Sequence, residues 1–266
     1  NNGKKNKKIA TLFSNSSFEN FSFSDYDVSK DGNWLLLFNS KESIYRRSSK
    51  SYYYLYNLKE KTLKSLADTS LGKQRLATFS PDNSKIAYVR DNNIYYKYLS
   101  DTIEIPITNN GEINKLINGA TDWVYEEEFS IHKGFFWSPD GSKIAYYVFD
   151  ERDVKQFEME MYGNLYPSQY KFKYPKAGED NSLIAVKVFD LDNLKTFDFD
   201  IGKNNWLSHH KKRLKEAAQP AVTALAILIA IVVASPPFFP NLTISALGII
   251  CTNFSANSYS NFDGKE

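Results

Sequence analysis

Residues 137–146 read Trp-Ser-Pro-Asp-Gly-Ser-Lys-Ile-Ala-Tyr, and this stretch decides the fold. Proline presets the φ angle of the first turn position, and Asp and Gly tolerate the backbone angles that a tight turn requires. The aromatic and β-branched residues on either side favour extended chain. The stretch therefore predicts a strand, a tight turn and a second strand.

Two further copies precede it. Residues 79–88 read Phe-Ser-Pro-Asp-Asn-Ser-Lys-Ile-Ala-Tyr, and residues 28–36 read Val-Ser-Lys-Asp-Gly-Asn-Trp-Leu-Leu. Asp91-Asn92-Asn93 reads as a hairpin turn between two more strands. A repeat of roughly fifty residues, with several short strands in each, is typical of propeller blades. We expect an all-β fold: a partial β-propeller of three to four blades of a larger propeller.

The charge balance and the cysteine and histidine counts argue against several classes of function. The 266 residues carry 33 basic and 31 acidic side chains, a net charge of +2. That balance argues against nucleic acid as a partner, because phosphate binding needs a basic surplus on one face. Cys251 is the single cysteine, which excludes an internal disulfide and a cysteine-based zinc site. The histidines are His132, His209 and His210, and neither a metal site nor a cofactor is expected.

The chain changes character near Asn205. Seventeen of its 18 tyrosines precede Trp206, and an apolar run follows at Ala221–Ala234. At 1.5 Å per residue this run reaches ~21 Å, short of the ~30 Å hydrocarbon core, so a membrane span is disfavoured. A packed helix over residues 217–234 and a tail unrelated to the rest both stay open. The expected division is an N-terminal tail (1–17), the partial propeller (18–205) and an unrelated or spurious tail (206–266).

Residues 122–128, Asp-Trp-Val-Tyr-Glu-Glu-Glu, place three carboxylates in a row. Adjacent like charges repel, and a site that holds a cation is one reason to tolerate them. On charge alone, a solvated acidic turn is the more common explanation of such a triplet.

The sequence of this segment resembles the double-glutamate motif of the dipeptidyl peptidase IV family of serine exopeptidases. Tyr174-Pro175-Lys176-Ala177-Gly178 resembles a second family signature, and Ile44-Tyr45-Arg46 lies where the family has an aromatic-arginine pair. The resemblance covers residues 18–205. It implies that Glu127 and Glu128 hold the substrate's N-terminal ammonium and that Arg46 contacts a substrate carbonyl. Two carboxylates match an ammonium because it has one charge and three donors.

The resemblance implies an enzyme that releases X-Pro or X-Ala dipeptides, with eight blades followed by an α/β-hydrolase domain. This chain contains no Gly-x-Ser-x-Gly nucleophile motif. We therefore expect no catalytic residue in it and no activity without the missing hydrolase domain and blades. The implied partners are peptide N-termini and, in the full-length enzyme, a second copy; the implied location is extracytoplasmic, in the periplasm or at the cell surface.

A non-enzymatic, TolB-like propeller scaffold that binds protein or ligand is the alternative, since such blades share the Ser-Pro-Asp-Gly turn. It does not explain residues 122–128 together with 174–178. A membrane-anchored binding protein is supported only by the apolar run Ala221–Ala234.

If the resemblance holds, Glu127 and Glu128 lie on a short helical or turn insertion that points into the central hollow. Arg46 then faces them within roughly 10 Å, because amine and carbonyl belong to one substrate residue.

Overall fold

A computed structural model describes residues 21–163 and 165–199 of the chain. The predicted tail 206–266, its apolar helix 217–234 and the N-terminal tail 1–17 lie outside these residues. Within the described part, the regular secondary structure is almost all β-strand, as the sequence predicted. None of the helices in that part is long and apolar enough to cross a membrane.

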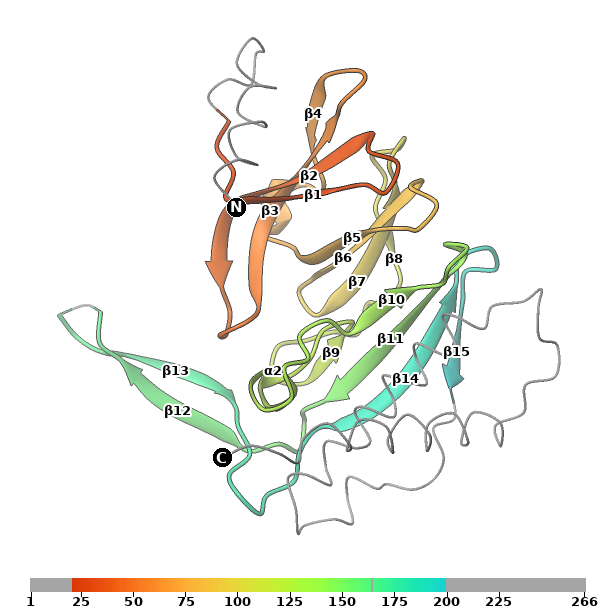
Figure 1. Cartoon of the computed structure of the whole chain (residues 1–266). Coiled ribbons are helices and arrows are strands. Elements are labelled where there is room, and N and C mark those ends of the chain that lie inside the picture. Colours follow the sequence, from red (N-terminus) through yellow and green to blue (C-terminus); the bar gives the residue numbers. More distant parts are fainter. Residues whose placement is uncertain (1–20, 164, 200–266) are drawn as a thin grey trace, which may run out of the picture.

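Three sheets of antiparallel strands follow one another along the chain, and Figure 1 shows them fanned out as an open partial propeller. We call them blade 1, blade 2 and blade 3. Blade 1 contains β1 (Asp25–Val28), β2 (Trp34–Ser43), β3 (Ser49–Asn57) and β4 (Thr62–Ser65). A 3-10 turn (Thr69–Leu71) leads to blade 2, which contains β5 (Arg75–Phe79), β6 (Lys85–Arg90), β7 (Asn93–Tyr98) and β8 (Ile105–Pro106).

Blade 3 contains β9 (Leu116–Asn118), β10 (Phe135–Trp137), β11 (Lys143–Asp150), β14 (Leu183–Asp190) and β15 (Lys195–Phe199). A two-stranded hairpin, β12 (Gln156–Met161) and β13 (Ser168–Lys173), projects away from the blades (Figure 1).

Strand alternation explains how the blades pack. Successive side chains of a strand point to opposite faces. In β6, Ile86 and Tyr88 join the core shared with blade 1, whereas Ala87 and Val89 join the core shared with blade 3. Both faces of blade 2 are therefore buried against the neighbouring blades, and this is why residues 86–89 of β6 form a continuous apolar run.

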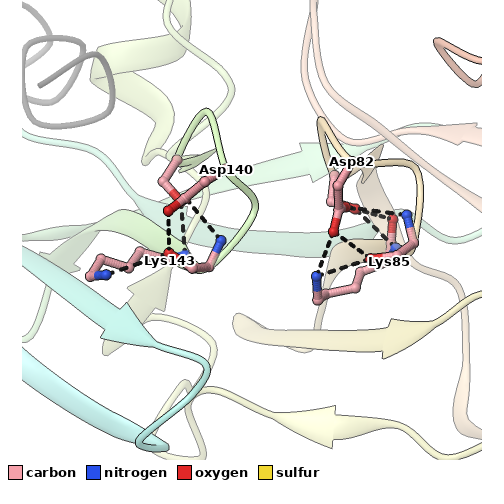
Figure 2. Close-up of polar contacts among 8 residues, drawn as sticks. Asp82, Lys85, Asp140 and Lys143 are labelled. Atoms are coloured by element: carbon pink, nitrogen blue, oxygen red, sulfur yellow. Dashed lines mark hydrogen bonds and ion pairs between the residues drawn. The ribbon is translucent and has the colours of Figure 1, made fainter. Parts of the chain in front are cut away.

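The three predicted turns have one construction. In the β10–β11 turn, the Ser138 hydroxyl donates to Asp140 at 2.5 Å and accepts from the Lys143 amide at 2.8 Å. In the β5–β6 turn, Ser80 and Asp82 repeat these contacts, and the Lys85 ammonium adds an ion pair of 2.9 Å to Asp82 (Figure 2). The serine and the aspartate of the motif thus close the turn through their own side chains.

The turns also fit against each other. The Lys30 amide of the first turn donates to the Asn83 side chain of the second at 2.9 Å. Gly141 of the third turn has a φ of +70°, and a Cβ there would lie 3.1 Å from Asp82 of the second. The close approach of neighbouring blades favours glycine at this position.

Candidate functional site: an acidic helix between two blades

The acidic segment leaves the sheet as an insertion in the innermost strand of blade 3. β9 and β10 both pair with β11, β9 along its second half and β10 along its first. Between them the chain makes helix α2 (Trp123–Glu127). The predicted short helical insertion is therefore confirmed.

Two glycines form the neck of this insertion. The Gly134 amide donates to the Gly119 carbonyl at 3.0 Å. A Cβ on Gly134 would lie 2.8 Å from the backbone of Ala120, and one on Gly119, whose φ is +72°, would lie 2.6 Å from Ile94. A side chain on Gly134 would force the two sides of the neck apart, and one on Gly119 would push against Ile94 of blade 2.

Asp122 caps the start of α2. Its carboxylate accepts from the Tyr125 amide at 2.9 Å and from the Ser182 hydroxyl at 2.5 Å. An aspartate at this position satisfies an amide that the first turn of a helix leaves unpaired. Burial raises the pKa of Asp122 above its ordinary value, although both hydrogen bonds oppose that shift. The cap fixes where the following glutamates lie.

The three glutamates occupy three different environments. Glu126 is fully buried, and its Oε1 accepts from the backbone amides of Arg47 at 2.9 Å and Ser48 at 2.7 Å. Glu127 is mostly buried, with 11% of its side chain exposed. Glu128 ends the helix and is exposed, and its carboxylate has no hydrogen bond or ion pair to the residues the structure describes.

Arg46 lies directly against Glu127. The Arg46 backbone amide donates to Glu127 Oε1 at 3.0 Å, and Arg46 Nε lies 3.1 Å from Glu127 Oε2. The Arg46 side chain is 75% exposed, so much of its guanidinium stays accessible. The structure thus brings Arg46 and Glu127 together and places Glu128 beside them on the open side of α2. Glu126 is the structural member of the triplet because it holds the loop that carries Arg46.

The second signature segment packs on the same helix. The rings of Trp123 and Tyr174 meet edge to face with their centroids 4.5 Å apart, and Phe172 lies next to both. Tyr125 is buried against Phe149 of blade 3. These aromatic side chains are packing residues. His132 is exposed near the insertion, and no group of His, Cys, Asp and Glu in the described ranges could hold a metal ion.

A charged pocket beside this site was not predicted. Burial, together with the nearby Asp122 carboxylate, raises the pKa of Glu151 to about 7. Arg75 and Glu151 both line the pocket. Neither stands in a recognisable motif, and only the packing of four sequence-distant parts of the chain forms the pocket that they share.

The fold and the site define a propeller segment that carries an acidic helical insertion facing an arginine of another blade. Residues 29–211 match the family model of the dipeptidyl peptidase IV N-terminal region. The chain therefore belongs to the dipeptidyl peptidase IV family through this region.

Individual relatives agree with this assignment. The chain is 37% identical over 173 residues to dipeptidyl peptidase 4 of Felis catus, covering 63% of this chain and 22% of that protein. It is 36% identical over 173 residues to prolyl endopeptidase FAP of Homo sapiens, covering 64% and 23%. The crystal structure of Porphyromonas gingivalis dipeptidyl peptidase 4 superposes with a TM-score of 0.67 at 39% identity, covering 71% of this chain and 27% of that one. The chain thus spans about a quarter of the length of these relatives.

Proposed function

We propose that this chain supplies the substrate-selecting part of a dipeptidyl peptidase IV-like serine exopeptidase. In this role Glu127 and Glu128 bind the free N-terminal ammonium of a peptide, and Arg46 binds the first carbonyl. The observation that carries the proposal is the contact of the largely exposed Arg46 side chain with the Glu127 carboxylate, with the exposed Glu128 following directly in the chain. The hydrolase domain that would cleave the peptide, its X-Pro or X-Ala preference, the homodimer and the extracytoplasmic location belong to the same proposal.

The chemistry follows from the charges. An ammonium has three donors, and each glutamate oxygen has two lone pairs, so Glu127 keeps acceptor capacity beside Arg46. A peptide that continues past its first residue would lack the free amine and would meet the carboxylates with nothing to neutralise them. The arrangement therefore selects chain ends, and cleavage would fall at a fixed distance from the amine.

A titration on the 266-residue chain tests the proposal. Alanyl-prolinamide is added to isotopically labelled protein, and its binding is followed by NMR shifts and compared with that of N-acetyl-alanyl-prolinamide, so that neither probe carries a carboxylate. We expect weak binding of the free dipeptide and none of the acetylated one. Glu127→Gln and Glu128→Gln should each weaken binding about tenfold or more, because each removes a charge-assisted hydrogen bond.

Glu112→Gln is the matched control. Glu112 is 59% exposed, and its one ion pair within residues 21–163 and 165–199 is to Lys115 at the surface, so its loss should leave binding unchanged. Equal binding of the acetylated and free dipeptides would refute the ammonium clamp and favour a non-enzymatic scaffold.

A further inference from the structure

A pocket of about 370 Å³ lies where blade 1, blade 2, blade 3 and the β12–β13 hairpin converge, and we call it the Arg75 pocket. Its volume is within the range of small-ligand sites. The loop before β3, the start of β5, the β6–β7 turn, β9 and β13 all contribute to its wall. The residues used below are Tyr45, Arg75, Ile117, Glu151, Lys171 and Phe172.

The pocket has a surplus of positive charge. Five of its lining residues are Lys or Arg and two are acidic. Four of the five cations already have an acidic partner: Lys50 and Lys73 with Glu42, Arg90 with Glu104, and Lys171 with Glu158. Arg75 is the fifth, and within residues 21–163 and 165–199 it has no ion pair.

The guanidinium of Arg75 is the unusual group. Its Nε and Nη2 atoms are shielded from solvent and have no hydrogen-bond partner in the described part of the chain. Burial lowers the pKa of Arg75, although the nearby Glu126 carboxylate opposes that shift. Glu126 thus supplies compensating charge, but it does not accept the guanidinium's hydrogens. A buried donor without an acceptor costs free energy, so this site is suited to a ligand that brings one.

We propose that the Arg75 pocket binds a small organic carboxylate. The planar guanidinium fork matches the two oxygens of a carboxylate, and that pairing is specific in geometry as well as charge. Tyr45, Ile117 and Phe172 line the same pocket and provide apolar surface for the body of the ligand. The proposal does not rest on the ammonium clamp, since it uses none of Arg46, Glu127 and Glu128.

Glu151 makes the binding dependent on pH. Its pKa is raised to about 7, chiefly by burial and then by the carboxylates of Asp122 and Asp150, while Lys173 opposes the shift. Below about pH 7 the neutral Glu151 can donate a hydrogen bond to an anion. Above it, the ionised carboxylate repels the anion, whereas Arg75 stays charged throughout. Affinity for a carboxylate should therefore fall as the pH rises through 7.

The experiment uses benzoate as the probe and its neutral isostere benzamide as the comparison, both titrated onto the 266-residue chain by NMR. We expect benzoate to bind about tenfold more tightly than benzamide at pH 6, and the difference to shrink at pH 8. Glu151→Gln should remove the pH dependence. Arg75→Met should remove the preference for benzoate, and Lys187→Met, which changes a surface cation on β14, should keep it.

Two results would overturn the proposal. One is equal binding of benzoate and benzamide to the unmodified chain, a comparison that needs no variant to fold. The other is full benzoate affinity in Arg75→Met. Arg75 would then only balance the buried charge of Glu126.

Competition with dipeptides identifies the source of the carboxylate. If the natural occupant is the acidic side chain of a peptide, glutamyl-prolinamide should displace benzoate and glutaminyl-prolinamide, which carries no carboxylate, should not. If it is a free carboxylate, neither dipeptide should displace it. The comparison of free and acetylated dipeptides tests the ammonium clamp independently, because it depends on the peptide amine and not on Arg75.

Discussion

Replacing Glu126 with alanine should release the loop that carries Arg46. One oxygen of Glu126 accepts two backbone amides of blade 1, from Arg47 at 2.9 Å and Ser48 at 2.7 Å, although 79 and 78 residues separate the partners. A hydrogen bond to a charged group contributes about 1.5–3 kcal/mol, and both donors would be left unpaired. Glu126 is fully buried, so water does not replace it. We expect Glu126→Ala to cost about 3–5 kcal/mol in the free energy of unfolding.

Glu126→Gln removes the negative charge of this side chain and keeps its shape. The amide oxygen can still accept from both backbone groups, but neutral hydrogen bonds are roughly half as strong as charged ones. We expect a cost of about 1–3 kcal/mol. The control is Glu112→Ala, which breaks an exposed ion pair of 2.6 Å to Lys115 and should cost at most about 1 kcal/mol.

Urea unfolding followed by tryptophan fluorescence measures the free energies, and amide hydrogen exchange at Arg47 and Ser48 measures the loop. The exchange measurement is needed because a surface loop can open while the rest of a domain stays folded. Protection of both amides should be lost in Glu126→Ala and partly kept in Glu126→Gln. If Glu126→Ala matches the control in stability and leaves both amides protected, the inferred role of Glu126 is wrong.

Three further changes test other parts of the structure. Gly119→Ala should destabilise the protein by about 2 kcal/mol or more in urea unfolding, since the new Cβ would lie 2.6 Å from Ile94 at a φ of +72°. Burial lowers the pKa of Lys133 to about 8, so the unfolded state binds more protons above that pH. Stability should therefore rise between pH 8 and 10, and this slope should disappear in Lys133→Met. Asp82→Ala and Asp140→Ala should each cost about 1–2 kcal/mol in thermal unfolding, because each aspartate ties its turn together; a cost near zero for both would contradict the shared construction.

The blades could be predicted because their signals are local. Each turn is closed by residues within a few positions of one another, so the sequence motif already contains the interactions that form it. The β6–β7 turn is equally local, with Asp91 and Asn92 both at positive φ, where Asn and Asp are tolerated. Strand alternation then assigns each side chain to one of two faces.

The different roles of the three glutamates could not be derived from the residues alone. Glu126, Glu127 and Glu128 are identical in type and adjacent in the chain. The burial of Glu126 and Glu127 is set by partners on another blade, at Arg46, Arg47 and Ser48, whereas Glu128 has no such partner among the described residues. The resemblance to the family separated Glu126 from the other two, but its bonds to backbone amides became visible only in the structure. The Arg75 pocket was missed for the same reason, because its wall comes from four parts of the chain.

The candidate site depends on blade 2 although that blade supplies none of its residues. Arg46 belongs to blade 1 and Glu127 to the insertion of blade 3, and their bonds join the loop after β2 to α2. The whole of blade 2 lies between them in sequence, and its two faces pack against the blades on either side. Larger or smaller side chains in that packing would move blade 1 relative to blade 3. Arg46 would then shift relative to Glu127 although neither residue is changed. The bonds of Glu126 and Glu127 to residues 46–48 fix the spacing of the candidate clamp, and the buried side chains of β6 hold the two blades where these bonds can form, so binding of an ammonium should be sensitive to substitutions there.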